Sequence, residues 1–469
     1  MKKSLLFLVQ NATLAIFQLS FVTLSSRIFA PNQFAYYAVE LALISLISGI
    51  GAAGFTQIVF SEVSERENFS RYQLRRSVIT GSYLTLLGSA LVVPWFWVWN
   101  LSASLLLLFL PLVSLMLAPT FNLCASLVRA EYGVKASVFL QISSFFMGYL
   151  MAAYLALAFK NELTLFVGQI GSQLLFVLVF FVFYRQSTSL AYSKHGGHSN
   201  AHLKAEKSDQ AKITFLRNVR FLSAISYVSN NIFRWATAWV FGSMTLGHLN
   251  RGEALAVGPI GQVQNAFTSS ISAGEQGSKK LHMTGESDTR RIIGNYALAV
   301  LSGALFLSII LPEVTFALMG PKWSAAGTIS GWILLSWAGT SVFSASSYIF
   351  EVQSRWRQAF IMQFSGLFLG TFSVVVGIAT RDFSFAVQFL GLANYLGAVT
   401  FAIALARKSV AGSSQGSLVR KIFFSSAFLA VLLLLPVSPW VPYLREFLVI
   451  IGLGFSAIAF ILAVRGDAD

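Results

Sequence analysis

Residues 185–220, RQSTSLAYSKHGGHSNAHLKAEKSDQAKITFLRNVR, form the longest polar stretch of the chain. Apolar blocks of about twenty residues follow one another on both sides of it, six before and eight after, separated by short polar turns. A helix of that length matches the roughly 30 Å hydrocarbon core of a bilayer. The stretch is therefore predicted to be a basic linker between two bundles of membrane helices.

The composition of the whole chain points to the same fold class. Of 469 residues, 56% are hydrophobic and 11% are charged, and the mean hydropathy is +0.69. Soluble domains carry about 25% charged residues, so this chain has too much apolar surface for one water-soluble core. The short alternating pattern of barrel strands is not present in the sequence. The predicted fold class is an all-α polytopic membrane protein with about 14 transmembrane helices.

The apolar blocks predict six spans before the linker, near 5–28, 36–60, 78–99, 103–128, 136–158 and 163–184. Eight are predicted after it, near 219–243, 255–273, 293–317, 325–349, 359–379, 383–405, 422–439 and 443–464. An even number of spans places both termini on one side of the membrane. The predicted domains are a six-helix lobe (1–184), the linker (185–218), a second six-helix lobe (219–406) and two additional helices (407–469).

The two lobes are predicted to be pseudo-symmetric because residues 26–71 and 240–291 share one layout. Each segment has a helix end, a short outside turn, a helix rich in small residues, and a polar inside loop that ends in arginine. Two six-helix repeats joined by a cytoplasmic linker are typical of transporters, with the substrate path between the halves.

The basic residues indicate the orientation of the chain. With both termini in the cytoplasm, 26 of the 33 Lys and Arg residues fall in inside segments, six in outside turns, and Arg234 within a span. Cytoplasmic loops of membrane proteins carry an excess of Lys and Arg. The net charge of +15 is therefore assigned to orientation, and no nucleic-acid partner is predicted.

The loops argue against several classes of enzyme. The outside turns are all predicted to be short, whereas membrane polymerases and ligases that act on exported sugars usually need a sizeable external domain. The inside loops contain neither a P-loop for ATP nor an acidic pair suited to a metal-dependent glycosyltransferase. His195, His198 and His202 are interpreted as part of a solvated linker rather than as a metal site, and Cys124 as a buried apolar residue. The chain is predicted to be no enzyme and to use no metal or cofactor.

Charged residues inside spans are costly and usually face a cavity. Arg234 lies in the middle of the span segment SNNIFRWATAWV, where Asn230, Asn231 and Thr237 share its helix face. This stripe is interpreted as a substrate-binding surface, with an ion-pair clasp, for instance to Glu40, as the structural alternative. Glu40 is the one acid that the prediction places well inside a span, and it is either an ion-coupling group or the partner of a buried arginine.

Two further arginines are candidate substrate-binding residues. Arg27 closes the first span at the outside edge, and Arg129 lies at the inner end of the fourth. For each, the alternative is a long side chain that reaches to the lipid headgroups. The amides that could line a hydrated path, or else join helices by hydrogen bonds, are Gln18, Gln57, Asn122, Gln169, Gln173, Gln262, Gln264 and Asn265.

Three segments resemble landmarks of a known family. They are SSRIFAPNQFAYYAVELALISLISGIGAAGFTQIVF (25–60), NNIFRWATAWVFGSMTLG (230–247) and FALMGPKWSAAGTISGWILLSWAG (316–339). With the layout of residues 5–405, they make the chain similar to bacterial polysaccharide exporters of the oligosaccharide-flippase type. These exporters belong to the multidrug/oligosaccharidyl-lipid/polysaccharide (MOP) superfamily.

The resemblance implies a transporter that flips polyprenyl-pyrophosphate-linked oligosaccharide repeat units, by alternating access, for surface polysaccharide biosynthesis. The units would move from the cytoplasmic to the outer leaflet of the bacterial plasma (inner) membrane. A pyrophosphate requires a buried arginine with hydrogen-bonding neighbours, and Arg234 with Asn230 and Asn231 is the predicted site. The implied partners are the lipid-linked oligosaccharide and membrane lipids, and other polysaccharide-assembly proteins remain an open possibility.

Several alternatives stay open. Within the same superfamily they are a peptidoglycan lipid-precursor flippase and a cation-coupled drug exporter, the latter disfavoured by fourteen spans and a central arginine. Outside it they are a membrane glycosyltransferase or polymerase, which requires a long external segment, and a scaffold of a polysaccharide-synthesis complex.

Overall fold

The computed structural model describes residues 2–35, 37–38, 78–87, 90, 105–161, 163–191, 202–272 and 286–409. Within these residues the chain is helical apart from short turns, and no strand occurs in them. Six of the described helices are long and apolar enough to cross a membrane. Their spanning parts are Lys135–Phe159, Thr164–Val182, Thr289–Met319, Pro321–Val352, Trp356–Thr380 and Phe383–Leu405. The predicted all-α polytopic fold class is confirmed.

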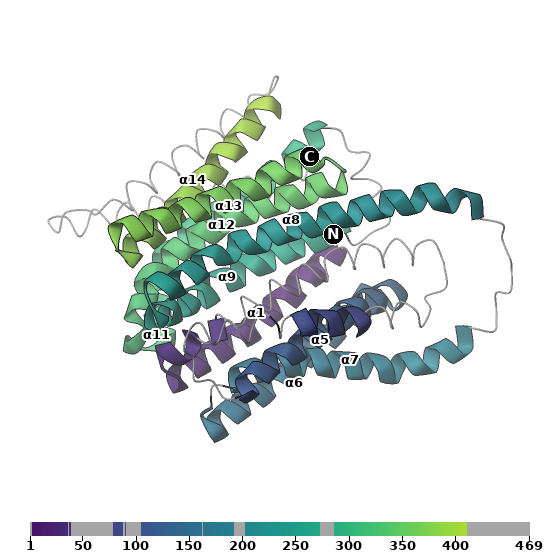
Figure 1. Ribbon diagram of the computed structural model, residues 1–469, viewed down its shortest axis with the longest axis horizontal. Helices are drawn as coiled ribbons and strands as arrows, with labels where there is room; N and C mark the ends of the chain where they lie inside the picture. Colours follow the sequence, from purple (N-terminus) through teal and green to yellow (C-terminus); the bar gives the residue numbers. More distant parts are fainter. Residues whose placement is uncertain are drawn as a thin grey trace. The chain divides into compact units, whose positions relative to one another are not determined.

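The chain divides into two compact units, Met1–Asn231 and Ile232–Asp469. In the first unit, α6 is the central helix, because it packs against α1, α5 and α7 (Figure 1). The helices of this unit are α1 (Lys2–Ile28), α5 (Leu105–Glu131), α6 (Gly133–Phe159) and α7 (Thr164–Ala191).

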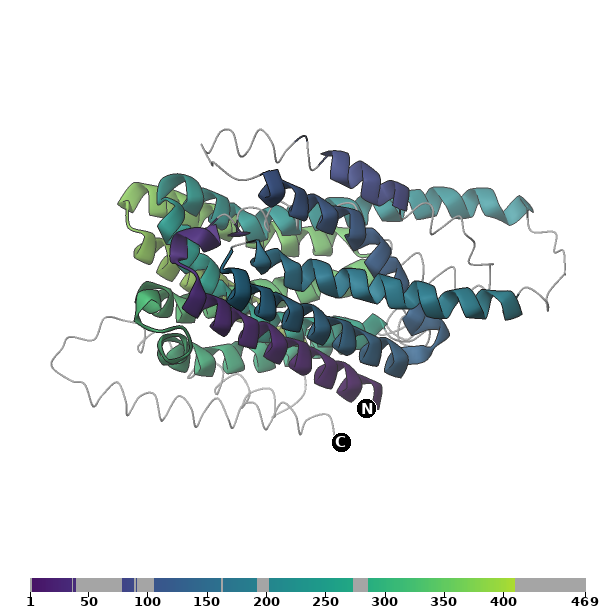
Figure 2. The same cartoon turned by 90° about the horizontal axis from the view of Figure 1, so that it is seen from below.

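Small and aromatic side chains set the contacts of α6. A Cβ atom on Gly148 would lie 2.6 Å from the backbone nitrogen of Ser172 and 2.8 Å from the carbonyl oxygen of Gly168. Only glycine therefore lets α6 and α7 approach so closely. On its other side α6 runs beside α1 (Figure 2), where the rings of Phe17 and Phe146 have centroids 5.3 Å apart.

The interpretation of Cys124 as a buried apolar residue is confirmed. It is fully buried on α5, in a core that includes Leu123, Leu127, Phe176 and Phe180. This core joins α5 to α7, so the thiol fills space between two helices of the first unit.

In the second unit, α12 (Ser324–Val352) is the central helix, and it packs against α9, α11, α13 and α14. Most of its side chains are buried, and many of them are Gly, Ala or Ser. Small polar groups join it to its neighbours: the hydroxyls of Tyr296 and Ser341 lie 2.6 Å apart, and Asn394 Nδ2 donates to Ser336 Oγ at 3.1 Å. Hydrogen bonds of this kind hold membrane helices together where no hydrophobic force does so. The other helices of this unit are α9 (Ser243–Ser272), α11 (Glu286–Met319), the single turn η1 (Pro321–Trp323), α13 (Trp356–Thr380) and α14 (Phe383–Ser409).

The predicted spans agree with α1, with α5 to α7, and with α11 to α14 to within several residues at most of their ends. The predicted span 78–99 is described only at 78–87 and 90, which are helical. The predicted spans 36–60, 422–439 and 443–464 lie outside the described residues, apart from residues 37 and 38.

The predicted linker 185–218 is helical at both of its ends. The helix α7 continues to Ala191, and α8 (His202–Val240) begins at His202. The division between the two compact units falls within α8. The lobe boundaries placed from the sequence remain predictions.

The outside turn expected at 244–254 is wrong. The helix α8 ends at Val240, and α9 begins at Ser243. Gly242, at φ +84°, lets the chain reverse within two residues. Arg251, which was expected in that turn, therefore lies inside α9 and is buried.

Candidate substrate-binding site

A tight helical hairpin builds the candidate site. The end of α8, from Ile232 onward, and the whole of α9 belong to the second unit, and only Phe241 and Gly242 separate the two helices. At 1.5 Å per residue, Arg234 lies about 9 Å before the end of α8, and Glu253 lies about 15 Å beyond the start of α9. The short turn thus lets the two charged side chains meet between antiparallel helices.

Arg234 and Glu253 form an ion pair in which Arg234 Nε donates to Glu253 Oε2 at 2.6 Å. The two side chains are 17% and 9% exposed. The clasp foreseen for Arg234 is thus present, but its partner is Glu253; Glu40 lies outside the described residues. Glu253, which the sequence prediction placed in a turn, is a buried acid on a helix.

Two of the polar neighbours predicted beside Arg234 each donate a hydrogen bond to their own helix. Asn231 Nδ2 donates to the carbonyl of Tyr227 at 2.8 Å, and Thr237 Oγ1 donates to the carbonyl of Phe233 at 2.7 Å. Both side chains are buried. Asn230 is half-buried, and its side chain makes no hydrogen bond to any residue that the structure describes.

The first half of α9 contains further buried polar groups. Arg251 is 3% exposed, and its Nη2 and Nε donate to Asn250 Oδ1 at 2.9 and 3.3 Å. One turn earlier, the ring of His248 meets Trp323 of η1 edge-on, with centroids 5.5 Å apart. Buried polar side chains therefore occupy the part of α9 that leads up to Glu253, where the sequence predicted an outside turn.

These residues of α9 were not predicted because the run HLNRGE has the composition of a turn. The internal repeat carried a signal that could have identified Glu253. Residues 31–35 are helical directly after Phe29 and Ala30, so the two-residue connection at Phe241 and Gly242 has a counterpart in the first half. Counted from these connections, Glu40 is the tenth residue and Glu253 the eleventh. The two acids thus occupy nearly equivalent sequence positions.

The other predicted site residues lie elsewhere. Arg27 is exposed in the last turn of α1, and Arg129 lies near the end of α5. Both belong to the first unit, whereas Arg234 belongs to the second, so a joint site remains a prediction. Among the amides, Gln173 is buried, Asn265 is exposed, Gln57 lies outside the described residues, and Gln18, Asn122, Gln169, Gln262 and Gln264 are half-buried.

Metal ligands do not gather in the described part of the chain. No group of three or more His, Cys, Asp or Glu side chains there is placed to hold an ion. His195 and His198 of the linker lie outside that part.

No protein-family model matches the sequence, and no curated protein matches it significantly. Several solved structures do match. The lipid II flippase MurJ, in an inward closed conformation, is 12% identical with a TM-score of 0.59, over 98% of this chain and 98% of its own. A MOP superfamily transporter from Pyrococcus furiosus is 16% identical with a TM-score of 0.57, over 87% of this chain and 94% of its own. An outward-facing multidrug resistance MATE family transporter of the MOP superfamily is 15% identical with a TM-score of 0.57, over 87% and 96%.

These neighbours are membrane transporters rather than enzymes. At such identities the likeness concerns the fold. It extends over nearly the whole length of the flippase and of this chain, including the parts on either side of the linker. The chain therefore has the polytopic helical fold of MOP superfamily transporters.

Proposed function

We propose that this protein flips a polyprenyl-pyrophosphate-linked oligosaccharide from the cytoplasmic to the outer leaflet of the bacterial plasma (inner) membrane. The flipped units would serve surface polysaccharide biosynthesis, and transport would proceed by alternating access between the two predicted lobes. The observation that carries the proposal is the buried ion pair between Arg234 and Glu253. It lies in a helical fold similar to that of the lipid II flippase.

Arg234 is the proposed pyrophosphate ligand, and Glu253 is its partner when no substrate is bound. A guanidinium can bind phosphate through two parallel hydrogen bonds, and in the structure Arg234 Nε donates a hydrogen bond to Glu253 Oε2. Exchange of the carboxylate for a pyrophosphate oxygen keeps the cation paired throughout. Arg234 therefore avoids the large cost of an unpaired buried charge. Glu253, which is buried and loses its partner in this exchange, takes up a proton to avoid the same cost.

The remaining candidates take supporting roles in this proposal. Asn230, half-buried on the same helix, offers an amide to the pyrophosphate or the first sugar. Asn231 supports the local helix while it keeps its bond to Tyr227. Arg27 and Arg129 are proposed as cations of the first lobe that meet the substrate, and Glu40 remains the proposed ion-coupling group.

A deletion strain tests the proposal directly. We expect full-length lipid-linked repeat units to accumulate on the cytoplasmic leaflet while surface polysaccharide is lost. Complementation with Arg234→Ala should fail even when export is compared at a matched amount of folded protein, whereas Arg381→Ala, at an exposed arginine between α13 and α14, should restore export. Truncated repeat units would indicate an enzyme instead, and normal glycan with raised drug sensitivity would indicate a drug exporter.

A peptidoglycan lipid-precursor flippase is the second candidate, and one observation favours it. The lipid II flippase structure covers 98% of this chain, whereas the two other MOP transporters compared here cover 87%. Rescue of a strain depleted of its own lipid II flippase would establish this alternative. Failure to rescue, with surface polysaccharide lost on deletion, would leave the oligosaccharide flippase.

A further inference from the structure

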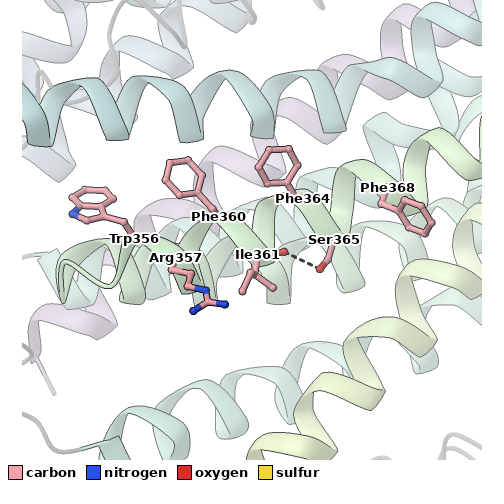
Figure 3. A pocket seen from close by; sticks show the side chains of 7 residues that line it. All are labelled: Trp356, Arg357, Phe360, Ile361, Phe364, Ser365 and Phe368. Carbon is pink, nitrogen blue, oxygen red and sulfur yellow. Dashed lines mark hydrogen bonds between the residues drawn. The ribbon is translucent and has the colours of Figure 1, made fainter.

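An apolar groove runs along the outer face of α13. It is lined by Trp356, Arg357, Phe360, Ile361, Phe364, Ser365 and Phe368 (Figure 3). Residues four apart on a helix stack into rows, so the four aromatic residues form one wall and Arg357, Ile361 and Ser365 form the other. The hydroxyl of Ser365 donates to the carbonyl of Ile361 at 2.8 Å. Its proton is therefore used within the helix, and the side chains that line the groove beyond Arg357 offer no polar donor to a ligand.

Three apolar side chains of this groove are exposed. Ile361, Phe364 and Phe368 are 50%, 47% and 68% exposed on a helix that is long and apolar enough to cross a membrane. In a bilayer such a face meets hydrocarbon rather than water. The groove is therefore suited to a lipid chain.

A cation stands at one end of the groove. Arg357 is exposed, and its side chain makes no ion pair or hydrogen bond with any described residue. The helix begins at Trp356, so the positive end of its dipole lies at the same end. Between 351 and 368 the sequence contains a single acid, Glu351, which is half-buried at the end of α12. This end of the groove thus favours a negatively charged group.

The length of the groove matches one leaflet of a bilayer. From Arg357 to Phe368 the helix rises about 16 Å at 1.5 Å per residue. Half of the hydrocarbon core is about 15 Å thick. When Arg357 lies at the level of the headgroups, the aromatic wall reaches to the middle of the membrane and no further.

We propose that this groove is a binding site for one anionic phospholipid, with the headgroup phosphate on Arg357 and an acyl chain along Phe360, Phe364 and Phe368. An anionic lipid is assigned because Arg357 makes no ion pair with any acid that the structure describes. A phospholipid is assigned rather than a polyprenyl carrier because the groove ends after one leaflet. This site is independent of the proposed transport function.

Native mass spectrometry of the full chain, purified in detergent with equal amounts of phosphatidylglycerol and phosphatidylcholine, tests the site. We expect one phosphatidylglycerol to be retained preferentially. Arg357→Gln should lower that preference by about fivefold, the effect of one basic residue near an anionic surface, while Arg357→Lys should keep most of it. Phe364→Ala should lower the retention of both lipids.

Two matched controls separate the groove from general attraction. Arg381→Gln removes an exposed arginine at the other end of the same helix, and Phe316→Ala removes a ring on α11 that is 54% exposed. Both should retain the lipid as the unmodified protein does. An equal loss in Arg381→Gln, equal retention of phosphatidylcholine, or unchanged binding in Arg357→Gln would overturn the site. Displacement of phosphatidylglycerol by an equal amount of polyprenyl phosphate would overturn the assigned occupant.

Discussion

At the scale of single residues, Arg234 pairs with the carboxylate of Glu253, and a guanidinium has the geometry to bind a phosphate through two parallel hydrogen bonds. A purely structural clasp requires only that opposite charges meet between α8 and α9, whichever helix provides the cation. A phosphate-binding site requires the cation at the position of Arg234. The two roles therefore respond differently when the charges are exchanged.

Charge exchange provides the first prediction. Arg234→Ala or Glu253→Ala alone should each cost about 3 kcal/mol, because a partly buried charge is left without its partner. The double variant Arg234→Glu with Glu253→Arg should regain most of that stability. Its export of lipid-linked oligosaccharide should nevertheless stay absent, because the cation has moved to α9.

Thermal unfolding in detergent measures the stability of these variants, and surface polysaccharide in the complemented deletion strain measures export. Arg381→Ala is the control for loss of an exposed arginine and should change neither. If the variant with exchanged charges exported at the normal rate, the role of Arg234 would be structural only, and it would not be a pyrophosphate ligand.

At the scale of helices, the close contact of α6 with α7 yields the second prediction. Gly148→Ala should destabilise the protein by about 1–3 kcal/mol, because the added Cβ meets the backbone of α7 at Ser172 and Gly168. Gly294→Ala, within α11, is the matched control, since nothing lies within 4 Å of its added Cβ. The control should be neutral or stabilise by up to about 1 kcal/mol. Equal melting temperatures for the two variants would contradict the close packing.

The hairpin between α8 and α9 yields the third prediction. Gly242→Ala places a Cβ in the left-handed region, at φ +84°, and should cost about 1 kcal/mol. Because this turn sets the register of Arg234 and Glu253, export should fall further than that loss of stability explains. Export measured at a matched amount of folded protein would show this, with Gly294→Ala again as the control. A variant that loses stability but exports normally would uncouple the turn from the site.

The same hairpin shows what could be predicted from the sequence. Most described helices were predicted because each is a long apolar run between polar turns, and this signal depends on composition alone. The start of α9 was missed because buried polar groups that satisfy one another have the composition of a loop; the bonds of Arg251 to Asn250 and of Arg234 to Glu253 exist only in the folded chain. Arg234 was identified as a site residue because it lies in an apolar stretch of sequence. Glu253 was not identified, since the residues around it in the sequence are polar.

At the scale of the whole molecule, the predicted repeat of the two lobes relates Glu253 to Glu40. Glu40 and Glu253 follow two-residue connections at nearly the same count. Glu253 lies in α9, and Glu40 falls in the second span predicted for the first lobe. A transporter built from two related halves can provide equivalent groups from both sides of its path. This correspondence supports Glu40 as the first lobe's candidate, although the sequence alone assigned it for a different reason.

Orientation yields the last prediction, and the single native cysteine makes it simple to test. Cys124 is fully buried, so the unmodified protein should not react with a membrane-impermeant maleimide. The Lys and Arg distribution places Lys160 and Arg381 outside and Ser354 inside, and all three residues are exposed in turns between helices. In spheroplasts, Lys160→Cys and Arg381→Cys should be labelled at once, and Ser354→Cys only after the membrane is permeabilised. The reverse pattern would place both termini outside and move the Arg357 end of the α13 groove to the outer leaflet. Labelling of all three from outside would contradict the alternation of spans itself, because α13 alone separates Ser354 from Arg381.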